Sequence, residues 1–209
     1  MKRALLATVL SAAIVVGVAA ASGLSLTNPP SLHKTAPATF RAKFITTKGP
    51  FVIKVYRAWA PKGADRFYNL VYYHFYNNQP LFRVEPGNVV QWGISMTPAI
   101  AKAWRYAFIN DDPATKNNSK GRVTFAISGK NTRTTQIFVN LAPHLYGPSF
   151  APFGEITSGM PVFKQLYHGP GWHGQYPQNN QAAMIKYGGS WFHQYFPNYD
   201  WIKTARIVH

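Results

Sequence analysis

Hydrophobic and polar positions alternate over short stretches of this chain, a pattern that predicts a structure built mainly from β-strands. Two β-rich runs, residues 40–47 and 51–56, are separated by Lys48-Gly49-Pro50, an order of residues that indicates a hairpin. In the second run one face carries Phe51, Ile53 and Val55. Further strands are predicted at residues 81–84, 89–93, 123–128, 136–141, 153–156 and 201–208.

Two helices interrupt these strands. Pro61 can occupy the first turn of a helix, and it is followed by an apolar stripe of Ala64, Phe67, Leu70 and Val71. The second helix is predicted at residues 160–167, with inward positions at Val162, Phe163 and Leu166. Many short strands with two helices favour a β-barrel or a sandwich over a doubly wound sheet.

Two long segments, residues 99–120 and 168–198, are predicted to be irregular connections. They are rich in glycine, asparagine, glutamine and aromatic residues, and long segments of this kind usually form functional surfaces or lids. One interpretation is a surface for cell-wall carbohydrate made by Trp172, Tyr176, Trp191 and Tyr195. The alternative is that the same aromatic residues pack the C-terminal segment onto the strands.

The first 21 residues have the pattern of a signal peptide. Lys2 and Arg3 precede an apolar stretch at residues 4–20, and Ala19-Ala20-Ala21 offers a cleavage site of small residues. Cleavage would leave no stable membrane anchor; a single-pass anchor is the alternative. The sequence therefore predicts a periplasmic or secreted protein. Residues 22–38, which contain three prolines, are predicted to be a linker, and residues 39–209 the domain.

Composition narrows the chemistry. Of 209 residues none is cysteine, which excludes disulfides, thiol nucleophiles and cysteine-based zinc sites. There are 22 lysines and arginines but only six acidic residues, too few for a two-metal site or an acidic calcium loop. The acidic residues are Asp65, Glu85, Asp111, Asp112, Glu155 and Asp200.

No cofactor or metal is expected from this composition. His168 and His173 lack the spacing of helical metal ligands and lie in a glycine-rich segment. The formal net charge of +16 would permit binding of nucleic acid, but the basic residues are scattered and the predicted export argues against such a partner. We expect a monomer.

Candidate chemistry is concentrated in three segments. In LFRVEPGNVVQWG (residues 81–93) two predicted strands meet at a Pro-Gly turn, which can place Arg83 and Gln91 on the same side of adjacent strands. In GKNTRTTQIFVN (residues 129–140) a polar loop leads into a strand with Gln136 and Phe138 on one face. In FAPFGEI (residues 150–156) another strand follows an aromatic residue.

These segments, in this order, resemble the cyclophilin family of peptidyl-prolyl cis–trans isomerases. The similarity runs from about Phe40 to Val208, and residues 82–93 resemble the family's Phe-x-Arg-x-x-Pro-Gly-x-x-x-Gln-x-Gly signature with the aromatic residue displaced by one position. The resemblance implies a mainly β fold, an eight-stranded antiparallel β-barrel capped by two α-helices. It also implies a peptide groove on the outside of the barrel.

The resemblance implies a role for each matching residue. Arg83 corresponds to the catalytic arginine, and Phe138 to the floor of the proline pocket. The other substrate-binding positions are Val89, Gln91, Ala126, Ile127, Gln136, Leu145 and Phe150. Four positions depart from the family: Asn88 replaces an aromatic residue, Val89 a methionine, Leu145 a tryptophan and Phe150 a histidine.

The implied function is isomerisation of X–Pro bonds in proline-containing polypeptides, in the folding of other exported proteins. Rotation must overcome amide resonance, a barrier of ~18–20 kcal/mol, but breaks no bond and needs no nucleophile or metal. A guanidinium can donate to the prolyl nitrogen only when the amide is twisted, which stabilises the transition state specifically. The departures at Asn88 and Leu145 leave an alternative, a non-catalytic proline-peptide-binding or chaperone module with the same fold.

Overall fold

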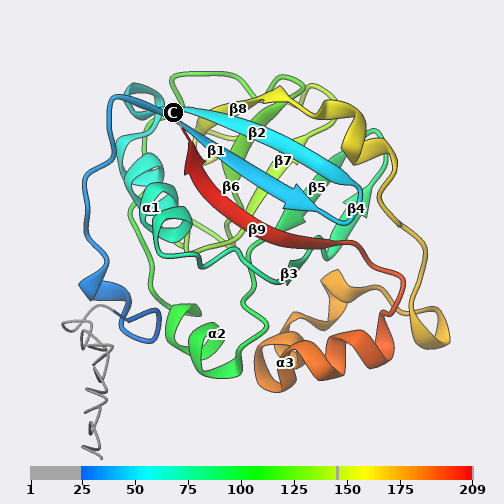
Figure 1. Ribbon diagram of the computed structural model, residues 1–209. Coiled ribbons are helices and arrows are strands. Elements are labelled where there is room, and N and C mark those ends of the chain that lie inside the picture. The colour runs from blue at the N-terminus through cyan, green and yellow to red at the C-terminus, as the bar shows by residue number, and fades with distance from the viewer. Residues whose placement is uncertain (1–24, 145, 209) are drawn as a thin grey trace, which may run out of the picture.

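One curled antiparallel sheet organises the residues described by this computed structural model, 25–144 and 146–208 (Figure 1). The predicted signal peptide and Leu145 lie outside these residues. The strands are β1 (Thr39–Thr46), β2 (Gly49–Tyr56), β3 (Gln79–Pro80), β4 (Arg83–Glu85), β5 (Val89–Trp92), β6 (Arg122–Phe125), β7 (Ile137–Asn140), β8 (Pro152–Ser158) and β9 (Trp201–Val208). Their order in the sheet is β3-β9-β1-β2-β8-β6-β7-β5-β4.

The predicted hairpin is confirmed as the pair β1 and β2. The two strands are antiparallel, with Phe44 opposite Phe51. The predicted face of β2, which carries Phe51, Ile53 and Val55, is fully buried. Because side chains on a strand alternate between its faces, the intervening residues of β2 lie on the less buried side.

The predicted strand at residues 81–84 forms only in part, because Leu81 and Phe82 belong to no strand and β4 begins at Arg83. With the additional edge strand β3, the described residues hold nine strands rather than eight. β3 pairs with β9, β4 pairs with β5, and only Leu81 and Phe82 separate β3 from β4. Pro80 has no N–H to donate, which suits its place at an edge. Both linking residues are fully buried. The chain therefore joins the two edges of the curled sheet covalently.

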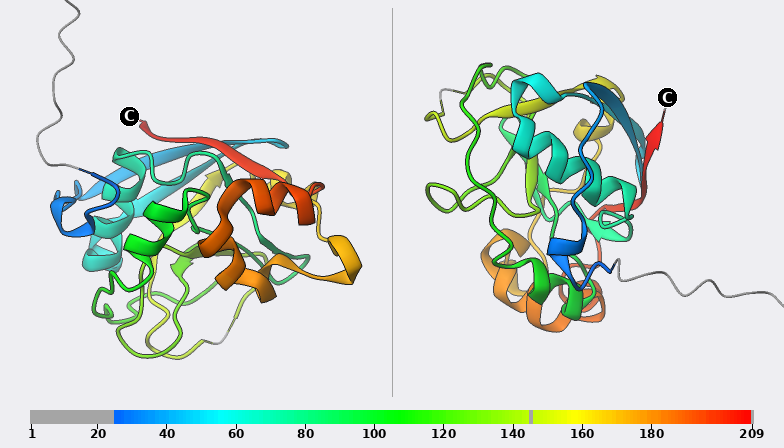
Figure 2. Two further views of the ribbon diagram at one scale, coloured as in Figure 1. Left: turned by 90° about the horizontal axis from the view of Figure 1, so that it is seen from below. Right: turned by 90° about the vertical axis from the view of Figure 1, so that its left-hand side faces the viewer.

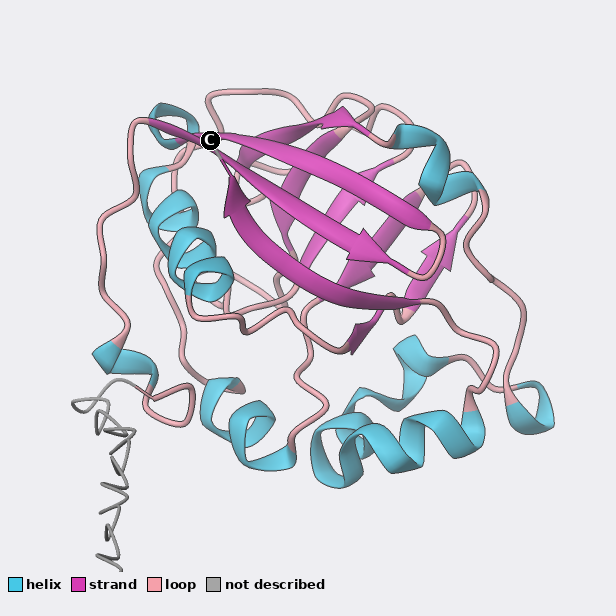
Figure 3. Cartoon of the chain, in the orientation of Figure 1, coloured by secondary structure: helices cyan, strands magenta, loops and turns pink. Residues whose placement is uncertain are grey.

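Three α-helices lie outside the sheet (Figure 3): α1 (Pro61–Tyr72), α2 (Pro98–Trp104) and α3 (Gln181–Tyr195). Helix α1 confirms the prediction for Pro61, and its predicted apolar stripe is buried. The other two helices occupy segments that were predicted to be irregular. Figure 2 shows both at the same end of the molecule, where they are in contact. The Gly189 N–H in α3 donates to the carbonyl oxygen of Met96 (3.0 Å), which lies just before α2.

The predicted second helix at residues 160–167 is shorter than expected and is not an α-helix. The segment forms a 3₁₀ helix, Met160–Lys164, although its three predicted inward residues are buried. Beyond the end of this helix, the Tyr167 N–H donates to the Asp200 carboxylate (2.7 Å).

Helix α3 is broken at Gly188, which adopts φ 71° and ψ −150°. A Cβ atom at this position would lie 2.5 Å from the Met96 carbonyl oxygen, so the close approach of this backbone requires glycine. Either side of the break, Met184 and Phe192 are fully buried in a small apolar cluster with Phe82 and Phe196. This cluster attaches α3 to the junction between β3 and β4.

The predicted linker is held against the domain over residues 25–38. Leu32 and Ala36 are buried in the main core. The side chain of Asn69 on α1 accepts from the Lys34 N–H (2.9 Å) and donates to the Lys34 carbonyl oxygen (2.7 Å). The Ala36 N–H donates to Asp65 (2.8 Å). This segment therefore covers one side of α1.

We expect Asn69→Ala to destabilise the protein by about 1–3 kcal/mol, because it leaves both backbone groups of Lys34 without their partners in a partly buried setting. The measurement is urea unfolding followed by circular dichroism. An unchanged unfolding midpoint would show that this contact contributes nothing to stability.

Candidate active site

A groove of about 880 Å³ lies on the outer face of β4, β5 and β7. Every described residue that the sequence analysis assigned to the site lines it: Arg83, Val89, Gln91, Ala126, Ile127, Gln136, Phe138 and Phe150. Leu145, the remaining predicted residue, lies outside the described part of the chain. Residues from five separate segments thus meet in one cavity.

Strand register places the three central side chains in one row. Arg83 on β4 is opposite Gln91 on β5, which is opposite Phe138 on β7. The residues that alternate with them, including Val90 and Val139, point into the core. The same alternation that buries one face of these strands therefore presents the row to the groove.

Hydrogen bonds fix the guanidinium of Arg83. Its Nη1 donates to Gln91 Oε1 (3.2 Å), while Nε and Nη2 donate to the two carboxylate oxygens of Glu85 (2.8 and 3.0 Å). The hydrogen bonds from Arg83 lower the pKa of Glu85 below its ordinary value, against the effect of partial burial. The arginine therefore faces the groove with a fixed orientation.

The amide of Gln91 continues this network across the groove. Gln91 Nε2 donates to Gln136 Oε1 (2.8 Å), and Gln136 Nε2 donates to Gln181 Oε1 (2.9 Å). Gln181 begins α3, so the C-terminal segment contributes directly to the site. The amide orientations of both predicted glutamines are consequently set by neighbours.

An aromatic wall stands beside Phe138. Tyr146 lies edge-on to Phe138 (ring centroids 5.7 Å apart) and packs on Phe150 (4.9 Å). Partial burial raises the pKa of the Tyr146 phenol. The sequence analysis missed this residue, although it directly follows the predicted Leu145. Asn88 makes no such wall, because its side chain donates to Glu85 (2.6 Å).

The opposite wall of the groove was not predicted from sequence. It includes Arg105, Tyr106 and Phe108, which follow α2, and residues from Gln178 to Ile185 around the start of α3. The aromatic rings of Tyr106 and Phe108 are exposed. The only available signal was the length and aromatic content of these two segments.

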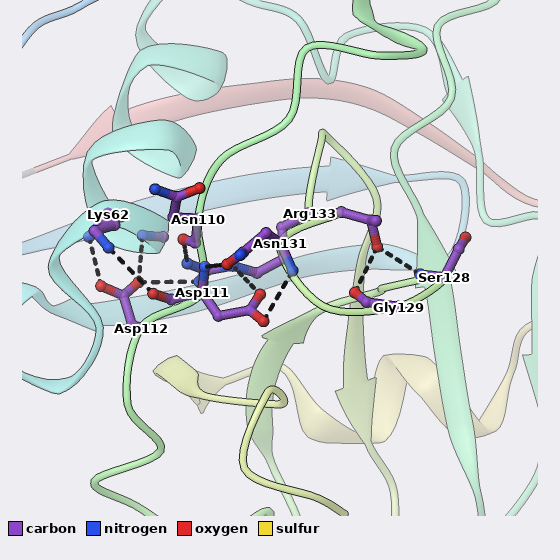
Figure 4. Close-up of polar contacts among 10 residues, drawn as sticks. Lys62, Asn110, Asp111, Asp112, Ser128, Gly129, Asn131 and Arg133 are labelled. Carbon is purple, nitrogen blue, oxygen red and sulfur yellow. Dashed lines mark hydrogen bonds and ion pairs between the residues drawn. The ribbon is translucent and has the colours of Figure 1, made fainter.

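A buried ion pair supports the loop between β6 and β7, which lines the groove (Figure 4). Arg133 Nη1 lies 2.9 Å from Asp112 Oδ2, and these two side chains are only 1% and 2% exposed. Asp112 also accepts from the N–H groups of Lys62 and Gly63 at the start of α1 (3.0 and 2.9 Å). Nearby, Asp111 and Asn131 exchange two hydrogen bonds. The loop is thereby attached to α1.

The aromatic residues suggested as a carbohydrate surface contact one another, since Trp172 and Trp191 each pack against Tyr195 with centroids 5.1 Å apart. Trp172 and Tyr176 nevertheless remain exposed. No cluster of three metal-binding side chains of the His, Asp or Glu type occurs in the described residues. Within the same residues no helix has the length and hydropathy needed to span a membrane.

The curled sheet and the Arg–Gln–Phe row define the class of protein. Residues 41–197 match the family described as cyclophilin type peptidyl-prolyl cis-trans isomerase/CLD, and the chain belongs to this family. It is 31% identical over 127 residues to "Peptidyl-prolyl cis-trans isomerase-like 1" of Aspergillus niger, covering 59% of this chain and 78% of that protein. It is 28% identical over 132 residues to a peptidyl-prolyl cis-trans isomerase of Acinetobacter baylyi, covering 60% and 70%.

Solved structures support the fold. A cyclophilin type isomerase of Cryptosporidium parvum superimposes with a TM-score of 0.60 at 17% identity, covering 82% of this chain and 98% of that one. A structure of the same protein in the presence of the dipeptide Ala-Pro gives a TM-score of 0.59 at 18% identity, covering 81% and 99%. The expected cyclophilin-like fold is confirmed.

Proposed function

We propose that this protein catalyses cis–trans isomerisation of X–Pro bonds in polypeptides, with Arg83 as the catalytic residue. The observation that carries the proposal is the row of Arg83, Gln91 and Phe138 in one groove. Family membership and the Ala-Pro dipeptide in the Cryptosporidium parvum structure support proline-containing peptides as substrates.

One part of the groove can bind the proline ring, and another part can stabilise the twisted amide. Phe138, Tyr146 and Phe150 provide an apolar pocket in which a proline ring can be held. Arg83 lies two strands away in the same row and can donate to the prolyl nitrogen once the amide has twisted. Because a planar amide offers no free nitrogen lone pair, this hydrogen bond stabilises the transition state more than the ground state.

A non-catalytic peptide-binding module is the second candidate. It is favoured by Asn88, which supplies no aromatic wall to the proline pocket. Tyr146 provides an aromatic surface on the same pocket, which favours the enzyme. The two candidates differ in turnover, not in peptide binding.

The site of action belongs to the same proposal. The basic residues, apolar stretch and small-residue end of residues 1–21 support export to the periplasm or the medium, and the absence of cysteine is compatible with it. The clients would then be other exported proteins that contain proline.

The proposal is tested with a coupled isomerisation assay on an X–Pro peptide, together with peptide titration. We expect the wild-type protein to accelerate isomerisation. We expect Phe138→Ala to weaken peptide binding and kcat/KM together, because the proline ring loses its floor. Binding without acceleration by the wild type would establish the non-catalytic module instead.

A further inference from the structure

One of the six acidic residues of this basic chain lies next to the proposed catalytic arginine. Glu85 and Arg83 are two positions apart on β4, so both side chains are on the groove side of the strand. Glu85 is the only carboxylate among the described residues that line the groove. Its two oxygens accept from Nε and Nη2 of Arg83, a bidentate geometry.

The contact with Glu85 uses only part of the hydrogen-bonding capacity of the Arg83 guanidinium. A guanidinium has five N–H groups. Glu85 takes the Nε–H and one on Nη2, and Gln91 takes one on Nη1. One N–H on each terminal nitrogen therefore stays available for a peptide. Gln91 alone, with a single bond of 3.2 Å, would leave the guanidinium free to rotate about that contact.

The carboxylate is itself held by the turn between β4 and β5. Asn88 Nδ2 donates to Glu85 Oε2 (2.6 Å), and the Asn88 N–H donates to the Glu85 carbonyl oxygen (2.9 Å). The Asn88 carbonyl oxygen in turn accepts from the Leu141 N–H (2.7 Å). Asn88, which holds the Glu85 carboxylate, is therefore itself fixed by hydrogen bonds to the backbone of Glu85 and of Leu141.

We propose that Glu85, held by Asn88, is a positioning residue that orients the guanidinium of Arg83 for proline isomerisation. This inference rests on the proposed function. Glu85 acts through Arg83 and contacts no reacting atom. This role accounts for Asn88, which stands where an aromatic residue of the proline pocket would be expected, because its side chain holds the Glu85 carboxylate by a hydrogen bond.

If the Glu85 carboxylate orients Arg83, protonation of Glu85 at acid pH should lower the isomerase activity. The charged and titratable groups around Glu85 are Arg83 on its own strand and Tyr146 across the pocket, with Arg105 on the far wall and His144 at the Asn88 carbonyl oxygen. Hydrogen bonding by Arg83 lowers the pKa of Glu85, so the ion pair persists to a lower pH than it would for a carboxyl group of ordinary pKa. Activity should therefore hold as pH falls from 7 and decline once Glu85 is protonated.

The test measures kcat/KM, peptide affinity and the pH profile for Glu85→Gln and Glu85→Ala. Misplacement of a reacting group by about 1 Å can lower a rate by ~10²-fold, and we expect that loss for Glu85→Ala. We expect a loss of roughly tenfold for Glu85→Gln, which keeps one acceptor oxygen. Peptide affinity should change little, and the acid decline of the wild type should be absent from both variants.

Glu155→Gln is the matched control. Glu155 pairs with Arg122 (3.1 Å) at a similar exposure, but neither residue lines the groove, so this variant should keep wild-type kcat/KM and its acid decline. If folded Glu85→Gln and Glu85→Ala retain wild-type kcat and pH profile while Arg83→Ala is inactive, Glu85 is not a positioning residue. A wild type without isomerase activity would refute the proposed function itself, which is a separate result.

Discussion

Arg83→Ala should lower kcat by about 10²–10³-fold, equivalent to roughly 2.7–4 kcal/mol of transition-state stabilisation, the usual cost of removing one preorganised donor. Peptide affinity should change little, because the proline ring is held by Phe138 and its aromatic neighbours. Arg83→Lys should remain poor, since an ammonium cannot donate to Glu85 and Gln91 in the geometry of the guanidinium. The measurement is an isomerase assay beside peptide titration.

Arg122→Ala is the matched control for this experiment. Arg122 also pairs with a glutamate, on the neighbouring strand β8, and it does not line the groove. We expect it to retain wild-type turnover. Folding of each variant is verified by circular dichroism. Equal turnover of Arg83→Ala and the wild type would remove Arg83 from the mechanism.

Arg133→Met should destabilise the protein by about 3–5 kcal/mol, because it leaves the carboxylate of Asp112 buried without its positive partner. For a chain of this size that corresponds to a fall in Tm of roughly 6–20 °C. Removal of this ion also takes away one of the contacts of the groove loop, because Arg133 Nη1 donates to Asp112, which binds the start of α1. Differential scanning calorimetry on the wild type and variant measures the change.

Two further variants interpret that result. Lys130→Met removes a positive charge from an exposed position of the same loop and should leave Tm nearly unchanged. Adding Asp112→Asn to Arg133→Met should recover part of the lost stability, because the buried charge is removed as well. A Tm for Arg133→Met equal to that of Lys130→Met would mean that the buried pair contributes no net stability.

The central row of the site was predictable because it depends on local rules. The short Pro-Gly turn sets the register of β4 and β5, and alternation along each strand then brings Arg83 and Gln91 to the same face. Phe138 follows from the same period on β7. Each of these residues lies on a strand whose hydrophobic pattern was visible in the sequence.

The far wall was not predictable, because tertiary contacts decide its structure. Helix α3 contains two consecutive glycines, which lower its intrinsic helix propensity. Its residues Met184 and Phe192 are buried because they pack in one cluster with Phe82, a contact that the local sequence does not indicate. Gln181 reaches Gln136 because of that packing. Tyr146 likewise lies in an irregular segment, where no helical or strand periodicity predicts which side chains face the pocket.

The position of β9 has a consequence for how the chain is made. β9 follows every other strand in the sequence, yet it lies between β3 and β1 in the sheet, with Ile202 opposite Gln79 and Ala205 opposite Phe44. Until β9 has been synthesised, β1 and β3 expose unpaired backbone edges, and such edges template association with other chains. Pairing between segments so distant in sequence is also intrinsically slow. In a chain whose β9 is not yet in place, β1 and β3 are therefore the edges at which association with other chains would begin.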